Sequence, residues 1–260
     1  MRSTSIPEGL YSNRFAGRRV VVTGAASGIG RAAAQRFASE GATVVAMDCD
    51  QAVHALAEKG SDVMAYVVDQ ADEHAVNDFF ARFDPDTIDV LCINAAIAAP
   101  LSSIADLETE RWRRVLGVNL DGSFFVARAA TSRLRRHCGG SIVFTSSTAG
   151  LYACPELPDY GVTKAGVISL ARSMALELAP LGIRVNTVCP GSVRTSFNKH
   201  LSHANPEARR EEAARKTPLG RIAEPEDIAG VIAFLASEDA RHVTAACLVV
   251  DGGQSAGERT

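Results

Sequence analysis

A glycine-rich turn is the feature that most constrains the fold of this chain. It covers residues 23–30, follows the β-branched run 20–22 and precedes the helix-favouring segment 31–40. Glycine permits a sharp turn between a strand and a helix and lets a phosphate group approach the backbone, while the helix N-terminus favours negative charge. The glycines are separated by three residues and then by one, so the spacing differs from the common G-x-G-x-x-G fingerprint. The pattern predicts a strand, a phosphate-binding turn and a helix.

Apolar runs alternate with helix-favouring segments along the rest of the chain, which is typical of a doubly wound parallel α/β sheet. Seven strands are predicted, at residues 19–23, 43–48, 63–68, 89–94, 141–146, 184–189 and 247–250. Asp72 and Thr109 are expected to cap the N-termini of helices. Pro85 is expected to end the helix that contains three phenylalanines, Phe79, Phe80 and Phe83.

Asp48 closes the second apolar run, about twenty residues after the glycines. A carboxylate at this place accepts hydrogen bonds from both hydroxyls of an adenosine ribose. It also repels a 2′-phosphate, because two charges about 4 Å apart interact by roughly 4 kcal/mol at an effective dielectric near 20. Neither Ser27 nor Cys49 supplies a compensating positive charge. The sequence therefore predicts NAD rather than NADP as the cofactor.

Tyr160 and Lys164 are four positions apart, so one helical turn places the phenol and the ammonium on the same helix face. A free phenol has a pKa of about 10, and proton transfer near pH 7 requires a fall of roughly 3 units. A neighbouring positive charge lowers the pKa. Ser147 follows a predicted strand thirteen residues upstream and can present its hydroxyl to the same substrate oxygen. The constellation predicts chemistry on a hydroxyl or carbonyl group.

Together these motifs resemble the short-chain dehydrogenase/reductase family, from about Arg18 to Gly253. The matching positions are the T-G-x-x-x-G-I-G turn, Asp69 after the third strand, Asn119, Ser147, the Tyr160/Lys164 pair, Pro190-Gly191 and the segment 250–253. The chain departs from the family pattern at Ile93 and Ala96, where the family usually has asparagine and glycine. It also has Ala245 where a glycine is common.

The resemblance implies an NAD-dependent oxidoreductase that interconverts a secondary alcohol and a ketone. Tyr160 would act as acid and base, Ser147 would hold the reacting oxygen, and Lys164 would lower the phenol pKa and bind the nicotinamide ribose. Asn119 would anchor a water, and Thr195 would hydrogen-bond the carboxamide. The full set expected at the cofactor is Gly24, Ser27, Gly28, Ile29, Gly30, Asp48, Asp69, Asn94, Tyr160, Lys164, Pro190, Gly191, Val193 and Thr195.

Three segments are expected to wall the substrate pocket: residues 97–101, residues 148–157 and a lid excursion at residues 192–217. The first two are largely apolar, which favours a medium-sized secondary alcohol or ketone. The residues expected to contact substrate are Ser147, Tyr152, Cys154 and Tyr160.

Other functions stay open at this point. A catalytically silent NAD-binding sensor or structural protein is one alternative, although such a protein has no need of the whole Asn-Ser-Tyr-Lys set. An NADP-dependent carbonyl reductase is a second alternative. The enoyl-reductase branch of the superfamily is disfavoured, because its tyrosine and lysine are typically separated by six residues rather than three.

Length and composition fit one domain over residues 1–260, with an N-terminal extension at residues 1–16. The net charge of -3 gives no reason to expect nucleic acid or an acidic membrane surface, and Arg133, Arg135 and Arg136 are interpreted as a solvated helix end. No apolar stretch of membrane-spanning length and no secretory signal is found, so a cytoplasmic protein is expected.

The six cysteines stand singly, without a C-x-x-C pair, which favours reduced, packed thiols over a disulfide framework or a zinc site. His200 and His203 form the only close histidine pair, and no acidic or thiol partner accompanies them, so no metal is expected.

The segment that carries Tyr160 and Lys164 is apolar around nearly its whole circumference. A helix of this kind needs burial on both sides. One side is expected to meet the sheet and the other a second subunit, in a tetramer if the family resemblance holds.

Overall fold

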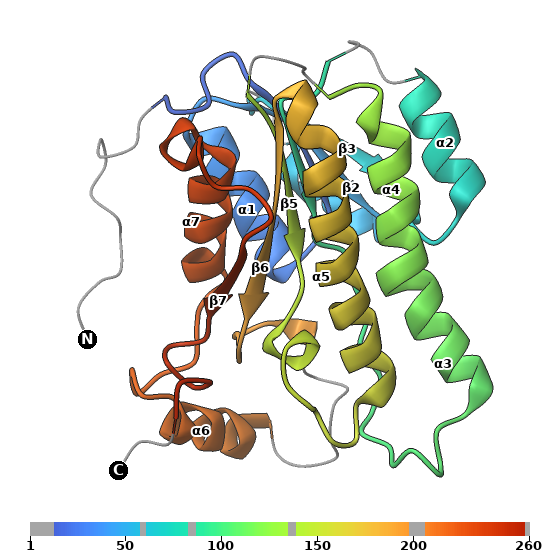
Figure 1. The fold of residues 1–260 in the computed structure, drawn as a ribbon, viewed down its shortest axis with the longest axis vertical. Helices are drawn as coiled ribbons and strands as arrows, with labels where there is room; N and C mark the ends of the chain where they lie inside the picture. The colour runs from blue at the N-terminus through green and yellow to red at the C-terminus, as the bar shows by residue number, and fades with distance from the viewer. Residues whose placement is uncertain (1–12, 58–60, 83–86, 135–138, 198–205, 258–260) are drawn as a thin grey trace.

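A seven-stranded parallel sheet with helices on both faces forms the centre of the molecule (Figure 1). The computed structural model describes residues 13–57, 61–82, 87–134, 139–197 and 206–257. The strand order is β3-β2-β1-β4-β5-β6-β7, and every neighbouring pair is parallel. The chain winds outward from β1 to β3 and then returns to place β4 on the other side of β1. This reversal confirms the predicted doubly wound Rossmann-type fold.

The strands are β1 (Arg19–Thr23), β2 (Thr43–Asp48), β3 (Val63–Val67), β4 (Val90–Ile93), β5 (Gly140–Thr145), β6 (Ile183–Pro190) and β7 (Cys247–Val250). The α-helices are α1 (Gly28–Ser39), α2 (Glu73–Arg82), α3 (Thr109–Leu116), α4 (Gly122–Thr131), α5 (Pro158–Leu178), α6 (Pro206–Lys216) and α7 (Pro225–Ala236). A π-helical turn, η2 (Gly117–Asp121), joins α3 to α4, and a short 3-10 turn, η3 (Thr148–Gly150), precedes α5.

The predicted strands agree with these limits at β1, β2 and β7 and differ by one residue at the ends of the other four. The Asp72 cap is confirmed, because its Oδ1 accepts a hydrogen bond of 3.0 Å from the Ala75 N–H. The Thr109 cap is wrong: Thr109 is already the first helical residue, and Glu108 precedes it without a side-chain hydrogen bond to the helix. Phe83 and Pro85 lie outside the described residues, as do Arg135, Arg136, Cys138, His200 and His203.

The core forms two layers because side chains alternate between the faces of a buried strand. In β1, Val20 and Val22 pack with α1 and α7, whereas Val21 packs with α2, α4 and α5. Phe37 is fully buried in the first layer, and Phe144 is fully buried in the second. Burial of these layers fixes where each strand ends, and therefore where the turns that follow the strands gather.

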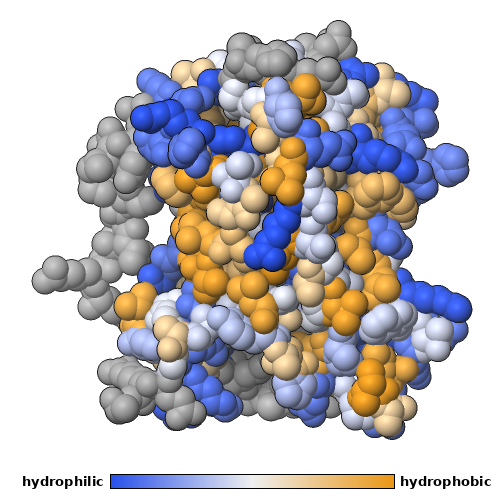
Figure 2. All heavy atoms as spheres, viewed as in Figure 1, coloured by the Kyte–Doolittle hydropathy of each residue, from blue (hydrophilic) through white to orange (hydrophobic). Residues whose placement is uncertain are grey.

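Helix α5 is only partly covered by the sheet, as its apolar circumference predicted. Val167 and Leu178 are buried, whereas Val162 is 48% exposed and Leu176 is 75% exposed. Phe124 of the neighbouring α4 is 41% exposed. Figure 2 shows hydrophobic residues spread over the middle of the face that these helices share in Figure 1. No helix within the described parts of the chain is both long enough and apolar enough to cross a bilayer.

Candidate active site

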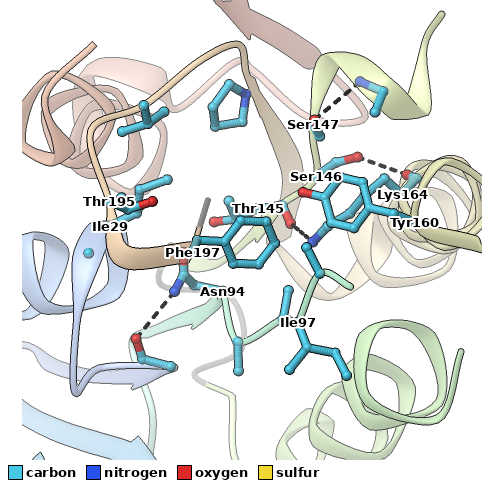
Figure 3. A pocket seen from close by; sticks show the side chains of 18 of the residues that line it. Ile29, Asn94, Ile97, Thr145, Ser146, Ser147, Tyr160, Lys164, Thr195 and Phe197 are labelled. Atoms are coloured by element: carbon cyan, nitrogen blue, oxygen red, sulfur yellow. Dashed lines mark hydrogen bonds between the residues drawn. The ribbon is translucent and has the colours of Figure 1, made fainter. Parts of the chain in front are cut away.

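A cavity of about 1060 Å³ opens at the carboxyl edge of the sheet, beside the point where the strand order reverses (Figure 3). The predicted site residues that line it are Gly24, Ser27, Gly28, Ile29, Asp48, Asp69, Asn94, Ser147, Tyr152, Cys154, Tyr160, Lys164, Pro190, Gly191, Val193 and Thr195. Gly30 and Asn119 lie behind the wall rather than in it. The cavity therefore brings both halves of the predicted constellation to one place.

The turn after β1 can be built only with glycines at two positions. Gly24 has a φ of 68°, and a Cβ there would lie 2.7 Å from the Ala95 Cα. A Cβ on Gly30 would lie 2.1 Å from the Gly24 carbonyl oxygen. The missing side chains let α1 begin directly against the turn, so that its N-terminus faces the cavity.

The N-terminus of α1 has the features of an anion site. Ser27 precedes the helix in an extended conformation without a side-chain cap, and the first turn carries no acidic residue. The first N–H groups of a helix have no partner within it, and their partial positive charge favours an anion. Ser27, Gly28 and Ile29 all line the cavity. This end of the cavity therefore fits the pyrophosphate of a dinucleotide.

Asp48 is held at the end of β2 by two backbone groups. Its Oδ2 accepts a hydrogen bond of 2.9 Å from the Ala26 N–H, and its Oδ1 accepts one of 2.9 Å from the Asp50 N–H. The basic side chains at the described cavity wall are engaged elsewhere, because Arg210 pairs with Glu207 and Lys164 donates to Thr145. The carboxylate is therefore fixed beside the phosphate end of the cavity, where it can accept hydrogen bonds from a ribose.

Asn94 ties β4 to the glycine turn. Its side-chain Nδ2 donates to the Thr23 carbonyl at 3.2 Å, and its backbone N–H donates to the Thr23 hydroxyl at 3.1 Å. The two departures from the family pattern beside it do not disturb these bonds: Ile93 is 2% exposed in the core, and Ala96 lies in the cavity wall.

Ser147, Tyr160 and Lys164 meet at the opposite end of the cavity. The Lys164 Nζ lies 5.6 Å from the centroid of the Tyr160 ring and donates to the Thr145 carbonyl at 3.0 Å. The Ser147 hydroxyl lies near enough to the Tyr160 phenol to influence its pKa. Ser146 fixes the helix beside them, since its hydroxyl donates to the Lys164 carbonyl at 2.8 Å. Figure 3 shows Tyr160 and Lys164 on α5, with Ser147 on the neighbouring segment that follows β5.

Burial is the largest influence on the pKa values of Tyr160 and Lys164. It raises the pKa of the Tyr160 phenol, and the nearby Ser147 hydroxyl offsets part of the rise. It lowers the pKa of Lys164 to about 8. The direction at Tyr160 is opposite to the expected fall, because desolvation outweighs the other influences on the phenol. Lys164 still keeps its positive charge at neutral pH, within 6 Å of the ring.

Asn119 is fully buried in the π-helical turn η2. Its Oδ1 accepts from the Ile97 N–H at 2.8 Å, and its Nδ2 donates to the Ile97 carbonyl at 3.0 Å and to the Thr163 hydroxyl at 3.2 Å. These bonds fasten the first pocket-wall segment to α5. The expected role of Asn119 as a water anchor stays a prediction.

Several residues of the cavity wall were not singled out from the sequence. Phe197 lies in the predicted lid, with its ring centroid 5.7 Å from that of Tyr160. Thr145 and Gln70 each have a buried side-chain oxygen without a hydrogen-bond partner. Gln70 directly follows Asp69 and Thr145 directly precedes Ser146, so their places at strand ends were the available signal. No pattern in the lid distinguished Phe197. The described residues contain no cluster of three or more His, Cys, Asp or Glu side chains that could hold a metal ion.

Comparisons with known proteins agree with this geometry. A family model described as enoyl-(acyl carrier protein) reductase matches residues 24–255. An L-rhamnose 1-dehydrogenase (NAD(P)(+)) of Azotobacter vinelandii is 41% identical over 251 residues, covering 91% of this chain and 96% of that protein. A meso-2,3-butanediol dehydrogenase of Serratia marcescens is 38% identical over 251 residues, covering 94% and 97%. The chain belongs to the short-chain dehydrogenase/reductase family.

Structural similarity supports the same assignment. A crystal structure described as a short-chain dehydrogenase/reductase, glucose/ribitol dehydrogenase, from Brucella melitensis matches with a TM-score of 0.84 and 34% identity, covering 94% of this chain and 98% of that one. The protein is therefore an oxidoreductase of the short-chain family, which uses a nicotinamide cofactor and acts on CH–OH groups. Although the matching family model is named for an enoyl reductase, Tyr160 and Lys164 have the three-residue separation that disfavours that branch.

Proposed function

We propose that this short-chain dehydrogenase/reductase interconverts a secondary alcohol and a ketone with NAD(H), using Tyr160 as acid and base. One observation carries the proposal: Ser147 and Tyr160, with the Lys164 ammonium beside the phenol ring, share a cavity with the α1 N-terminus and Asp48. A dinucleotide that reached from Asp48 past the α1 N-terminus would bring its nicotinamide toward the two hydroxyls.

The roles follow from the positions of the side chains. Ser147 would donate to the substrate oxygen, and Tyr160 would take the alcohol proton during oxidation or return it during reduction. Because burial raises the Tyr160 pKa, deprotonation needs a nearby positive charge, which Lys164 supplies as long as it keeps its proton. NAD⁺, when bound, supplies the hydride acceptor.

The preference for NAD rests on Asp48. Its two backbone hydrogen bonds prevent it from turning away from a ribose, and a 2′-phosphate would bring like charges together. We expect Thr195 and Asn119 to serve the carboxamide and a proton-carrying water, respectively, as in the family.

The substrate end of the cavity favours a compact alcohol. Its walls combine Ile97, Leu157 and Phe197 with Tyr152 and Cys154. The relatives named above act, by their names, on L-rhamnose and on meso-2,3-butanediol. We therefore propose a small secondary alcohol or diol as the substrate, with residues 192–217 as its lid.

We further propose that the protein is a homo-oligomer, with a tetramer favoured, and works in the reducing cytoplasm. The exposed apolar side chains Val162 and Leu176 on α5 and Phe124 on α4 support association, because a second subunit would remove them from water. Light scattering that shows only monomer at micromolar concentration would rule out the association.

Absorbance at the reduced-nicotinamide band tests the activity. NAD and NADP are compared in parallel across L-rhamnose, meso-2,3-butanediol and cyclohexanol. Reduction of NAD at a much higher kcat/KM than of NADP is expected with at least one of these substrates. Binding of NADH without turnover of any alcohol or of the corresponding ketones would favour a silent sensor instead. A preference for NADP would remove the role given to Asp48.

A further inference from the structure

Two cysteines far apart in the sequence lie side by side next to the site. The Cys189 and Cys247 sulfur atoms are 3.0 Å apart, and both thiols are reduced. They stand on neighbouring parallel strands, where Cys189 is opposite Val249 and Cys247 is opposite Thr187. Because side chains alternate along a strand, both point to the sheet face that α5 covers. The spacing of the cysteines in the sequence gave no sign of this pair.

We propose that Cys189 and Cys247 form a reversible disulfide within one chain when the protein meets a peroxide, and that this bond lowers turnover. The bond itself is independent of the proposed function, whereas the effect on turnover rests on it.

The distance between the sulfur atoms favours bond formation. A disulfide has a sulfur–sulfur length of about 2.05 Å, so the two atoms need to approach by about 1 Å. Because the two cysteines are offset by two residues in the ladder, the end of β7 must also shift to bring the Cα atoms within the roughly 7 Å that a disulfide spans. Strand β7 is the edge of the sheet and pairs with β6 alone. Cys247 is the first residue of β7, directly after the loop that joins it to the preceding helices. A strand end with one neighbour can move by this amount at lower cost than a central strand.

The two thiols differ in the way that stepwise oxidation requires. Cys247 is half-buried at the edge, whereas Cys189 is fully buried. The interaction with Cys189 and, to a smaller extent, the positive charge of Arg172 on α5 together lower the pKa of the Cys247 thiol to about 7, against the effect of burial. The same interaction and burial raise the pKa of Cys189. Cys247 is therefore the nucleophile and Cys189 the resolving thiol.

The reaction balances with peroxide as the oxidant. The Cys247 thiolate attacks one peroxide oxygen, which gives a sulfenic acid and releases hydroxide. The Cys189 sulfur then attacks the Cys247 sulfur and displaces the sulfenic oxygen, which leaves as water with the thiol proton. Two thiols lose two electrons, and one peroxide becomes two waters. A dithiol reductant reverses the change.

The bond would act on the site through β6. The Ser146 hydroxyl and the Ser147 backbone lie near enough to the Cys189 thiol to influence its pKa. Cys189 is followed by Pro190 and Gly191, which line the cavity. Pulling the Cys189 sulfur toward the edge strand would break its contact with the Ser146–Ser147 segment and move the end of β6. A displacement of about 1 Å at an active site can lower turnover by about 100-fold.

Mass spectrometry of the whole protein tests bond formation without any substrate. The reduced protein is treated with hydrogen peroxide, the excess is removed with catalase, and the chain is digested without reductant. A loss of two hydrogens, with a linked Cys189–Cys247 peptide that dithiothreitol separates, is the expected result. Oxygen added to single cysteines without that peptide, or a link between two subunits, would overturn the proposal.

Variants connect the bond to function. Oxidation should lower kcat/KM of the wild type by about 10- to 100-fold, and dithiothreitol should restore it. Cys247→Ser and Cys247→Ala should lose the linked peptide and change by less than about twofold on oxidation, each compared with its own unoxidised activity. Cys49→Ser and Cys154→Ser, matched controls that change the two cysteines of the described cavity wall, should stay sensitive. A wild type that forms the bond but keeps full turnover would refute the functional half, and insensitivity in either control would assign the loss to that thiol.

If no alcohol is turned over, NADH binding replaces activity as the readout. The oxidised wild type should then bind NADH more weakly than the reduced protein, and Cys247→Ser should not. Unchanged NADH affinity in the oxidised wild type would refute an effect on the site. Failure of the proposed function thus remains distinguishable from failure of the disulfide.

Discussion

The two ends of the cleft are built by different means. The nucleotide end comes mostly from one stretch of chain, residues 23–48, and backbone geometry holds it: Gly24 and Gly30 leave no room for a side chain, and two N–H groups fix Asp48. The chemical end gathers Ser147, Tyr160 and Lys164 from β5 and α5, and buried ionisable groups dominate it.

The two ends should therefore respond to different substitutions. An added methyl group at the glycine turn should weaken cofactor binding, whereas loss of one polar atom at the chemical end should lower turnover and leave cofactor binding intact. Substitutions at each end of the cleft separate these two kinds of failure.

Tyr160→Phe removes only the phenolic oxygen. The remaining ring keeps its contact with Phe197 and its place beside Lys164. Loss of a positioned acid and base should lower kcat by about 10²- to 10⁴-fold, while NADH affinity changes by less than about threefold. Steady-state kinetics and an NADH titration measure the two quantities. Tyr66→Phe is the matched control, because Tyr66 lies on β3 outside the cavity wall and is 40% exposed, and it should keep full turnover. Wild-type kcat in Tyr160→Phe would remove Tyr160 from the chemistry.

Gly30→Ala adds one methyl group at the nucleotide end. The new Cβ would lie 2.1 Å from the Gly24 carbonyl oxygen, so α1 must move away from the turn. We expect a loss of about 1–3 kcal/mol of folding stability, and NADH affinity lowered by more than about tenfold. Thermal unfolding and NADH titration provide the measurements. Gly230→Ala is the matched control within α7, where the nearest atom to the new Cβ is 3.9 Å away. It should be neutral or stabilising by up to about 1 kcal/mol. Normal NADH binding by Gly30→Ala would show that the turn tolerates a side chain.

Lys164→Met measures how much the buried charge of Lys164 lowers folding stability. In the folded chain Lys164 loses its proton near pH 8, against about 10.5 for a free lysine. Between these values the unfolded state holds more protons, so this group makes the free energy of unfolding rise with pH from about 8 to about 10.5. Below pH 8 the charged form is a burden of up to about 3 kcal/mol, and an apolar isostere should recover about 1–3 kcal/mol at pH 7 while abolishing turnover.

Denaturant unfolding of wild type and Lys164→Met from pH 7 to pH 10 measures the difference. The difference in free energy of unfolding between the two proteins should become smaller as pH rises, because the wild-type lysine becomes neutral. Glu177→Met, at an exposed position of the same helix, should change stability little at any pH. A less stable Lys164→Met at pH 7 would mean that the bond to the Thr145 carbonyl outweighs desolvation.

The same division explains what could be predicted from the sequence. Strands and the glycine turn follow local patterns, so their limits were predicted to within a residue, and the residues that end strands were known to share one edge. The helical spacing of Tyr160 and Lys164 likewise determined that they share a face.

Properties that depend on the packed molecule could not be predicted in this way. The sign of the Tyr160 pKa shift depends on how much burial the cavity imposes, which spacing does not contain. Phe197 reaches Tyr160 from a lid without periodicity, and Cys189 meets Cys247 only because β6 and β7 are neighbours. The Asn119 side chain is engaged by Ile97, a contact 22 positions away that no local motif indicates.

Gly24 and Gly30 are positions where the backbone requires glycine. Ala245, in a loop outside the cleft, is a position where the backbone favours glycine but the chain has alanine, so Ala245→Gly tests the same requirement from the opposite direction. Ala245 has a φ of 58°, which disfavours any side chain with a Cβ and accounts for the glycine common here in the family. Glycine relieves this strain, which stabilises the folded state. The change also raises the conformational entropy of the unfolded chain and removes the packing of one partly buried methyl, and both effects destabilise the fold. We expect the relief of strain to be larger, so that the free energy of unfolding rises by about 0.5 kcal/mol. Ala246→Gly, next to it and without a positive φ, should instead destabilise the protein by about 0.5–1 kcal/mol. Chemical unfolding measures both changes in stability, and kcat should not change in either variant, because neither residue lines the cavity.

If Ala245→Gly were as destabilising as Ala246→Gly, the packing of the Ala245 methyl group would outweigh its backbone strain. Backbone conformation would then decide the need for glycine at the nucleotide end but not at this loop.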